Sequence, residues 1–324
     1  ATGTFLVAAT RLGGRHGAGA DGAASTFGGA VTGFTKALAR EREAATIKAV
    51  DFAPSRKTAA LADLLIEETE RDPGAVEVGH ADGLRWTVAL AETDAVPDPA
   101  RALSADTTFL VTGAAGSIVS AITADLAAAS GGTFHLLDRV PAPDPGDPDL
   151  RRFAEDRDGL KRDLADRIRS RGEKATPKLV ERELAVIERA RAAQDAIDAI
   201  QAAGGTATWH QADLTDPEQV QAAVATALAD SPRIDVLLHC AGLEISHFLP
   251  DKTQAEWDLV FDVKAHGWIN LLAALGDADV GTAVGFSSIA GRFGNAGQTD
   301  YAAANDLLCK SVAAFRRDRP GTRG

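Results

Sequence analysis

The sequence predicts an α/β protein with a doubly wound parallel sheet, preceded by a smaller α/β unit. Three observations point to this fold class. Short apolar and β-branched runs alternate with longer runs that suit helices along the whole chain. The strand-like run Thr108–Thr112 leads directly into a turn from Gly113 to Gly116, and a helix-compatible stretch follows that turn. A chain of 324 residues is also long enough for two ordinary domains.

Composition argues against several classes of protein. No apolar run approaches the length that spans a membrane, and no signal-peptide pattern opens the chain. The net charge of −12 argues against nucleic acid or an anionic membrane as a partner. Cys240 and Cys309 form no disulfide framework, so we expect the reducing cytoplasm. The absence of methionine, and an end at Gly324 where another strand is expected, favour a segment of a larger enzyme.

Residues 1–104 are predicted to form the smaller unit. Its expected elements are strands at Thr4–Thr10 and Ile47–Phe52, helices at Ala30–Glu43 and Ala59–Arg71, and a hairpin of Val76–Val78 with Leu84–Leu90. The pair Asp82-Gly83 supplies the hairpin turn, because both residue types tolerate positive φ. Residues Val96–Ala100 contain two prolines and are the expected linker.

Residues 105–324 are predicted to form the doubly wound sheet. Its expected strands are Thr108–Thr112, Thr133–Arg139, Thr206–Leu214, Ile234–Gly242 and Thr282–Phe286. Two helices between these strands are expected to begin with capping boxes, one at Thr215 with Glu218 and one at Thr253 with Glu256.

The segment 141–203 interrupts the strand–helix alternation. Two helices are expected in it, at Leu150–Arg171 and Pro177–Ala202, and Thr176 is the expected N-cap of the second. The segment is densely charged with both signs. A solvated helical hairpin is the plainer interpretation. A docking or dimer surface for a carrier protein or a neighbouring domain is the functional alternative.

Polar side chains near the C-terminal end form the candidate catalytic set. Ser288 follows a predicted strand, and Tyr301, the only tyrosine, comes thirteen residues later. Asn305 lies one helical turn beyond Tyr301, so the two share a helix face. Free tyrosine titrates at roughly 10. A cation nearby would let Tyr301 protonate a carbonyl oxygen near neutral pH.

The spacing of Ser288, Tyr301 and Asn305 resembles the active site of ketoreductase domains of polyketide and polyunsaturated-fatty-acid synthases, complex members of the short-chain dehydrogenase/reductase superfamily. The resemblance implies that the catalytic lysine is Lys264, which lies 24 residues before Ser288. It also implies that residues 105–324 form a Rossmann-like catalytic subdomain. The smaller unit would be a truncated, reductase-like structural subdomain without cofactor. Its helix near Phe27 would be an inert copy of the catalytic one.

The turn after the first strand of the larger unit is the candidate nucleotide site. Its two glycines allow a tight turn, which lets backbone N–H groups approach a pyrophosphate at a helix start. An acidic residue after the second strand suits the ribose hydroxyls of NAD, whereas an arginine there suits the 2′-phosphate of NADP. NADPH is the expected cofactor, with NADH as the alternative. The expected nucleotide-binding residues are Gly113, Ala115, Gly116, Ser117, Ile118, Asp138, Arg139, Asp213, Leu214, Cys240, Ala241 and Gly242.

The activity that the resemblance implies is reduction of a β-ketoacyl thioester. The substrate would be bound to an acyl carrier protein, with neighbouring synthase domains as further partners and a homodimer as an open alternative. A free-standing carbonyl reductase and a structural pseudo-reductase are the rival functions. The last strands and the substrate lid of the family are absent from this sequence. Glu244-Ile245-Ser246 and Phe293 depart from the motifs that set hydroxyl stereochemistry, which is therefore left open.

Overall fold

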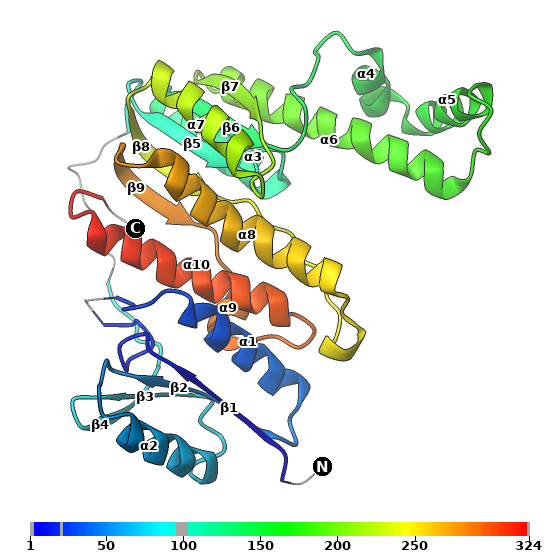
Figure 1. Ribbon diagram of the computed structural model, residues 1–324. Coiled ribbons are helices and arrows are strands. Elements are labelled where there is room, and N and C mark those ends of the chain that lie inside the picture. The colour runs from blue at the N-terminus through cyan, green and yellow to red at the C-terminus, as the bar shows by residue number, and fades with distance from the viewer. Residues whose placement is uncertain (1–2, 20–21, 95–102, 323–324) are drawn as a thin grey trace. The chain divides into compact units, whose positions relative to one another are not determined.

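The computed structural model describes residues 3–19, 22–94 and 103–322, so the expected linker Val96–Ala100 lies outside the described residues. The chain packs into two compact units (Figure 1). The first unit combines residues 1–100 with 242–273 and 280–324, and the second combines 101–241 with 274–279. The domains 1–104 and 105–324 stay a prediction, because packing groups the C-terminal helices with the N-terminal sheet.

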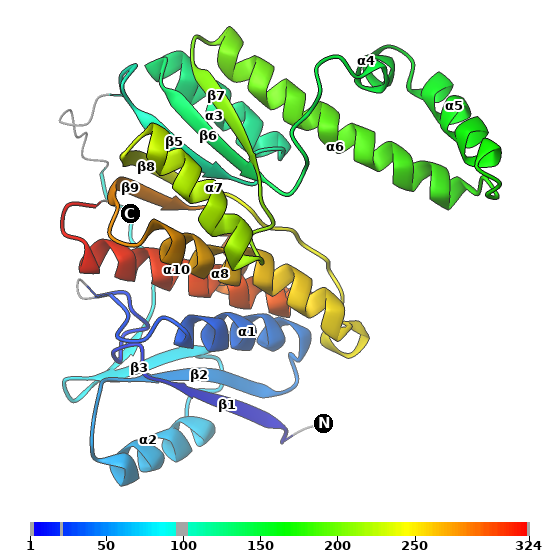
Figure 2. The ribbon, with the colours of Figure 1, turned by 45° about the horizontal axis from the view of Figure 1, so that its top comes forward.

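The second unit is built on a parallel sheet in which strands lie in the order β7-β6-β5-β8. The strands are β5 (Thr108–Thr112), β6 (Thr133–Asp138), β7 (Thr206–Gln211) and β8 (Arg233–His239). Every residue of β5 is buried, as expected for a central strand covered on both faces. Helices α3 (Ser117–Ser130) and α6 (Pro177–Ala202) cover one face, and α7 (Pro217–Asp230) covers the other (Figure 2). The predicted α/β fold class is confirmed.

The strand order places a topological switch beside β5. The chain runs from β5 to β6 and β7 on one side, and then returns to pair β8 with the other side of β5. In open α/β sheets, ligands bind at the carboxyl ends of the strands at such a switch point. The ends of β5 and β8 are therefore where a nucleotide is expected.

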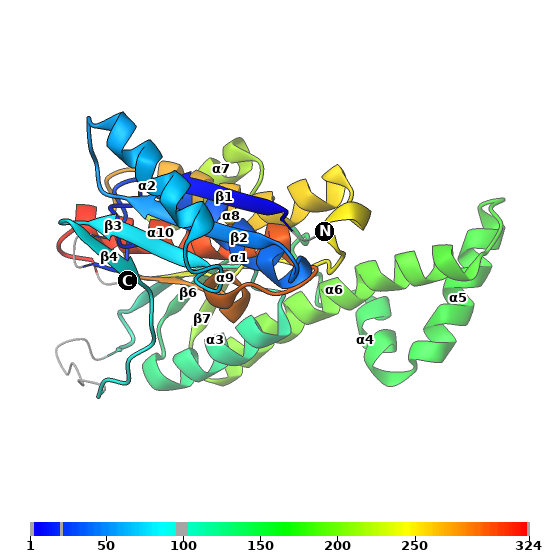
Figure 3. The same ribbon diagram turned by 90° about the horizontal axis from the view of Figure 1, so that it is seen from below.

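The segment 141–203 forms a helical arm made of α4 (Pro148–Glu155), α5 (Arg157–Ser170) and the first half of α6 (Figure 3). The prediction of one helix over Leu150–Arg171 is wrong, because Asp156 leaves helical geometry and caps α5 by accepting the Gly159 N–H at 2.8 Å. Thr176 caps α6 as predicted. The arm has a small apolar core of its own, formed by Leu160, Leu164, Ile168, Val180 and Leu184.

One predicted capping box is confirmed and the other is displaced by one residue. The Glu256 N–H donates to Thr253 Oγ1 at 3.2 Å, and the Thr253 N–H donates back to Glu256 at 2.9 Å. The box at Thr215 is wrong, since Asp216 is the N-cap of α7. Aspartate is as good a cap as threonine, and here it stands directly before the proline that opens the helix.

In the first unit, the N-terminal residues form a four-stranded sheet in the order β1-β2-β3-β4. The strands are β1 (Phe5–Thr10), β2 (Thr46–Phe52), β3 (Glu77–Ala81) and β4 (Leu84–Thr87). The predicted hairpin is confirmed, because β3 and β4 pair antiparallel around a turn in which Asp82 has a φ of 55°. Helix α2 (Thr58–Glu70) lies on one face of this sheet and α1 (Gly28–Glu41) on the other (Figure 2).

The C-terminal elements of the first unit are α8 (Gln254–Leu275), most of β9 (Asp279–Gly285), α9 (Ile289–Phe293) and α10 (Thr299–Asp318). Helix α10 is buried along most of its length and packs against α1. The two backbones meet at glycines. A Cβ atom on Gly29 would lie 2.9 Å from the Asp306 carbonyl oxygen, and one on Gly33 would overlap the Ala302 carbonyl. Only glycine allows this approach.

Buried charges connect the same two helices. Asp306 of α10 accepts hydrogen bonds from Thr32 and from Lys36 Nζ, the latter at 2.9 Å, and its other oxygen lies 3.4 Å from Lys310 Nζ. Burial lowers the pKa of Lys36 to about 8. Burial also raises the pKa of Asp306, but Lys36 and Lys310 outweigh it, so that pKa lies below its ordinary value of 3.8.

Replacing Gly33 with alanine is expected to destabilise the protein, although alanine normally favours a helix over glycine by about 1 kcal/mol. The added methyl group would overlap the Ala302 carbonyl, and overpacking of this kind costs about 1–3 kcal/mol. The free energy of unfolding, measured in urea, should fall by that amount. Gly74→Ala is the control, because no atom lies within 4 Å of its added Cβ. A more stable Gly33→Ala variant would contradict the close contact.

Replacing Asp306 with asparagine is expected to lower the free energy of unfolding at pH 7 by about 3–5 kcal/mol, because Lys36 and Lys310 lose their buried partner. The folded pKa of Asp306 is depressed, so its contribution is present above the unfolded value and is lost as pH falls through the folded one. The difference from wild type should therefore shrink below about pH 4. The exposed Asp125→Asn is the control. A deficit that stays constant down to pH 3 would contradict the ion pair.

Candidate active site

Lys264 is held at a defined place in the first unit. It projects from α8, is only 3% exposed, and its Nζ donates a hydrogen bond to the Phe286 carbonyl oxygen at 2.7 Å. A Cβ atom on Gly242 would lie 2.8 Å from this Nζ. The ammonium group therefore lies between the end of β9 and Gly242, where a larger residue would displace it.

Tyr301 and Asn305 lie one turn apart on α10, as predicted. Tyr301 is half-buried and Asn305 is fully buried. The Asn305 Nδ2 donates to the Tyr301 carbonyl at 2.8 Å, which fixes the amide plane. The Asn305 Oδ1 is buried and accepts no hydrogen bond from any side chain or backbone group in the described part of the chain. A buried carbonyl oxygen of this kind is normally satisfied by an ordered water.

Ser288 caps α9, and its neighbour serves α10. The Ser288 Oγ accepts the Ala290 N–H at 3.1 Å. Because the oxygen acts there as an acceptor, its own hydroxyl proton can be donated to a ligand. The Ser287 hydroxyl instead donates to the Asn305 carbonyl at 3.1 Å. Of the two adjacent serines, Ser288 is thus the one with a hydroxyl suited to a substrate oxygen.

The N-terminal elements of the first unit hold α9 in place. Arg292 of α9 forms an ion pair with Glu77 of β3, and Glu77 is also 3.2 Å from Lys36 Nζ. The Arg40 side chain donates to the Phe293 carbonyl at 3.3 Å. The helix that begins at Ser288 is therefore fixed by residues more than two hundred positions away, which the local pattern of the sequence does not reveal.

Three further charged residues that the sequence analysis did not single out lie beside α10. Lys252 Nζ is 2.9 Å from Asp300 Oδ2, and both side chains are buried. Glu41 of α1 accepts backbone N–H groups from Leu249 and Gly297. The only signal in the sequence was the position of Asp300 directly before the tyrosine.

The ends of β5 and β8 meet closely in the second unit. Gly113 has a φ of 71°, and a Cβ atom there would lie 2.8 Å from the Ala241 Cα. Thr112 Oγ1 accepts the N–H groups of Cys240 and Ala241 at 3.2 and 3.3 Å. This small-residue backbone lies at the switch point of the sheet, as predicted for a nucleotide site.

The start of α3 has the character that a pyrophosphate requires. Gly116 is the N-cap, and Gly116, Ser117 and Ile118 are exposed. The first N–H groups of a helix have no partner within it, and the helix dipole adds partial positive charge. The residues present therefore fit the diphosphate of a dinucleotide.

The residues after β6 and β7 are fixed by local hydrogen bonds. Asp138 accepts the N–H groups of Ala115 and Val140, one on each carboxylate oxygen and both at 3.1 Å, while Arg139 is exposed. Asp213 Oδ1 accepts the Thr215 hydroxyl at 2.7 Å. Leu214, the other residue predicted to flank the adenine, is buried.

The predicted residues divide between the two units. Lys264, Ser288, Tyr301, Asn305 and Gly242 belong to the first unit, and the remaining predicted nucleotide-binding residues belong to the second. Across the described ranges, no group of three His, Cys, Asp or Glu side chains is placed to hold a metal ion. None of the described helices is long and apolar enough to cross a membrane.

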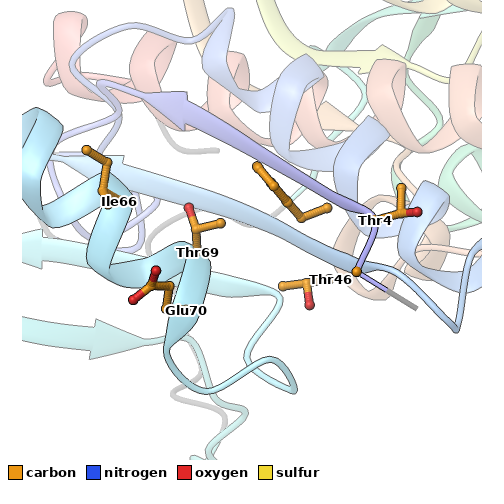
Figure 4. Close-up of a pocket in the computed structure, with 7 residues that line it drawn as sticks. Thr4, Thr46, Ile66, Thr69 and Glu70 are labelled. Atoms are coloured by element: carbon orange, nitrogen blue, oxygen red, sulfur yellow. The ribbon is translucent and has the colours of Figure 1, made fainter. Parts of the chain in front are cut away.

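A hollow in the first unit lies away from the candidate residues. It is lined by the starts of β1 and β2 and by α2, including Thr4, Thr46, Ile66, Thr69 and Glu70 (Figure 4). These elements form the face of the N-terminal sheet opposite α1 (Figure 2). None of the predicted catalytic or nucleotide-binding residues lines this hollow.

Similarity to known proteins agrees with this geometry. Residues 107–322 match the KR domain family. The chain is 30% identical over 327 residues to a polyunsaturated fatty acid synthase of Thraustochytrium sp., in an alignment with one of its subunits that covers 94% of this chain and 11% of that protein. It is 40% identical over 141 residues to the short-chain reductase protein NovJ of Streptomyces niveus, covering 41% of this chain and 52% of that one. The chain thus spans only part of either relative.

Solved ketoreductase structures have the same fold. A structure of A-type ketoreductases from a modular polyketide synthase aligns with a TM-score of 0.70 at 20% identity, over 98% of this chain and 56% of that one. A ketoreductase domain from the bacillaene assembly line gives a TM-score of 0.67 at 19% identity, over 97% and 63%. The chain therefore belongs to the KR family of ketoreductase domains found in polyketide and polyunsaturated-fatty-acid synthases, and is an oxidoreductase.

Proposed function

We propose that the protein reduces the β-carbonyl of an acyl chain held as a thioester on an acyl carrier protein, with NADPH as the hydride donor. One observation carries the proposal. An ammonium group, two hydroxyl groups and an amide come from three separate segments, α8, the β9–α9 connection and α10, and belong to one compact unit. These are Lys264, Ser288, Tyr301 and Asn305, whose contacts with one another's segments fix each group.

The proposed roles follow from these contacts. NADPH, when bound, supplies a hydride to the carbonyl carbon. Tyr301 gives its phenolic proton to the carbonyl oxygen, so that a hydroxyl group forms, and Ser288 donates a hydrogen bond to the same oxygen. Lys264 stabilises the tyrosinate that remains. Asn305 returns a proton through a water at its buried Oδ1, which lacks a protein partner in the described chain.

The choice of NADPH rests on Asp138 and Arg139. Both carboxylate oxygens of Asp138 already accept backbone N–H groups, which weakens its claim on the ribose hydroxyls of NADH. The exposed Arg139 suits a 2′-phosphate, since a guanidinium group binds phosphate in a bidentate manner.

The proposed partners follow from the relatives. One of them belongs to a polyunsaturated fatty acid synthase, and this chain corresponds to 11% of its length. We therefore propose an acyl carrier protein and neighbouring synthase domains as partners, in the cytoplasm. A homodimer, and docking on the arm of α4, α5 and α6, stay predictions.

Replacing Tyr301 with phenylalanine tests the function. The variant should bind NADPH with unchanged affinity, because its predicted contacts are elsewhere, but its kcat with a β-ketoacyl thioester should fall about 10²–10⁴-fold for want of the proton donor. Cofactor fluorescence measures binding and NADPH absorbance measures turnover. Thr226→Val, which removes an exposed hydroxyl from α7, is the control and should match wild type.

The same assay separates the rival functions. A free-standing carbonyl reductase would turn over a small ketone faster than the thioester. A structural pseudo-reductase would consume no NADPH with either substrate. A Tyr301→Phe variant with near-normal turnover would exclude the proposed mechanism.

A further inference from the structure

We propose that Lys252 and Asp300 are positioning residues, a buried ion pair that fixes Tyr301 relative to Lys264. The proposal rests on the proposed function for the role of Tyr301, but the contacts themselves do not depend on it. Lys252 lies at the end of the loop that follows Gly242, just before α8, and Asp300 lies in the first turn of α10. Neither Lys252 nor Asp300 contacts the reacting atoms in this account.

Asp300 holds the tyrosine from its N-terminal side. Its Oδ1 accepts the Tyr301 N–H at 2.8 Å. Its Oδ2 lies 2.9 Å from Lys252 Nζ, and the side chains of Asp300 and Lys252 are 0% and 1% exposed. A carboxylate is favoured at the start of a helix, where the helix dipole is positive. One side chain thus joins the backbone of Tyr301 to a charge on a different segment.

Lys252 extends the connection to the neighbourhood of Lys264. Its Nζ also donates to the Ile245 carbonyl oxygen at 2.8 Å. Ile245 lies three residues after Gly242, whose missing side chain leaves room for the Lys264 ammonium. The contacts therefore run from Tyr301 through Asp300 and Lys252 to the loop beside Lys264. They connect the proposed proton donor with the cation that is meant to stabilise it.

A second, independent clamp holds the same two loops together. The two carboxylate oxygens of Glu41 accept the N–H groups of Leu249 and Gly297, each at 3.0 Å. The His247 N–H donates to the Gly297 carbonyl at 3.0 Å. Leu249 and His247 belong to the loop before α8, whereas Gly297 belongs to the loop before α10. The loop from 243 to 252 is thus fixed along its length against the start of the catalytic helix.

A buried ion pair is a poor device for stability alone, because apolar residues of the same volume often stabilise a fold equally well. Its directional contacts instead specify one arrangement of the two segments. Proton transfer requires donor and acceptor within hydrogen-bond reach, and a displacement of about 1 Å can cost about 10²-fold in rate. The pair is therefore expected to matter more for kcat than for folding or for nucleotide binding.

The test uses Lys252→Met, Asp300→Asn and the double variant, together with a matched control. In Asp300→Asn the amide oxygen can still accept the Tyr301 N–H, so only the charge is lost. Lys48→Met is the control, because Lys48 and Glu68 form a comparably buried pair, 0% and 1% exposed, in the N-terminal part of the first unit. Measurements are the thermal midpoint, the KM for NADPH, kcat with a β-ketoacyl thioester, and the ¹³Cζ NMR signal of tyrosine. That signal reports on Tyr301 alone, because the chain has one tyrosine.

The proposal predicts that both single variants lose at least about tenfold in kcat, keep the KM for NADPH within about twofold, and show a shifted or split Tyr301 signal. The double variant should regain thermal stability, since no unpaired charge remains, but not kcat. Lys48→Met should alter stability without moving the tyrosine signal. The proposal is overturned if the folded single variants keep the wild-type signal and kcat, or if the double variant recovers full kcat. If wild type does not reduce the thioester, the proposed function fails, and the NMR signal alone still decides whether the pair positions Tyr301.

Discussion

The contact between α1 and α10 is the constraint on which the candidate site depends. Gly29 and Gly33 bring the α1 backbone against the carbonyl groups of α10, at the level of Asp306 and Ala302. The same turns of α10 carry the tyrosine and the asparagine on another side. The N-terminal sheet, through α1, therefore fixes the height and rotation of the helix that is proposed to do the acid–base chemistry. A small displacement of α1 would be transmitted to both groups, because close-packed helices do not deform independently.

Charge adds direction to this packing. Lys36 connects Asp306 of α10 with Glu77 of β3, and Glu77 in turn holds Arg292 of α9. The two segments that carry the serine and the tyrosine are thus fixed by the same group of buried side chains. The N-terminal residues include none of the predicted catalytic residues, yet they determine where these lie. This arrangement explains why packing groups residues 280–324 with the N-terminal sheet.

The two units divide the chemistry of a reductase. The second presents a close-packed backbone at Gly113 and Ala241 and an exposed helix start at Ser117, which suit a dinucleotide. The first presents an ammonium, hydroxyls and a buried amide, which suit proton transfer. The chain crosses between the units at Gly242, where the lack of a side chain leaves room for Lys264.

Local sequence patterns predicted the elements and the candidate residues but not the contacts that hold them. The turn at Asp82, the cap at Thr253 and the strand at Thr108–Thr112 follow from neighbours a few positions apart, and all three were predicted. The break at Asp156 was missed because the flanking residues all suit a helix and only the cap interrupts it. The long-range pairs could not have been predicted in this way. Glu41 binds Gly297 across 256 residues, and such partners are set by the tertiary fold, so the local spacing of either residue carries no signal for them.

The most direct test of the account follows the hydride itself. The protein is incubated with a β-ketoacyl thioester and NADPH that carries deuterium at the transferable position, and the product is analysed by mass spectrometry. The account predicts a β-hydroxyacyl thioester about one mass unit heavier than the unlabelled product, formed faster with NADPH than with NADH. A product without deuterium, or no reduction of the thioester by protein that binds NADPH, would contradict it.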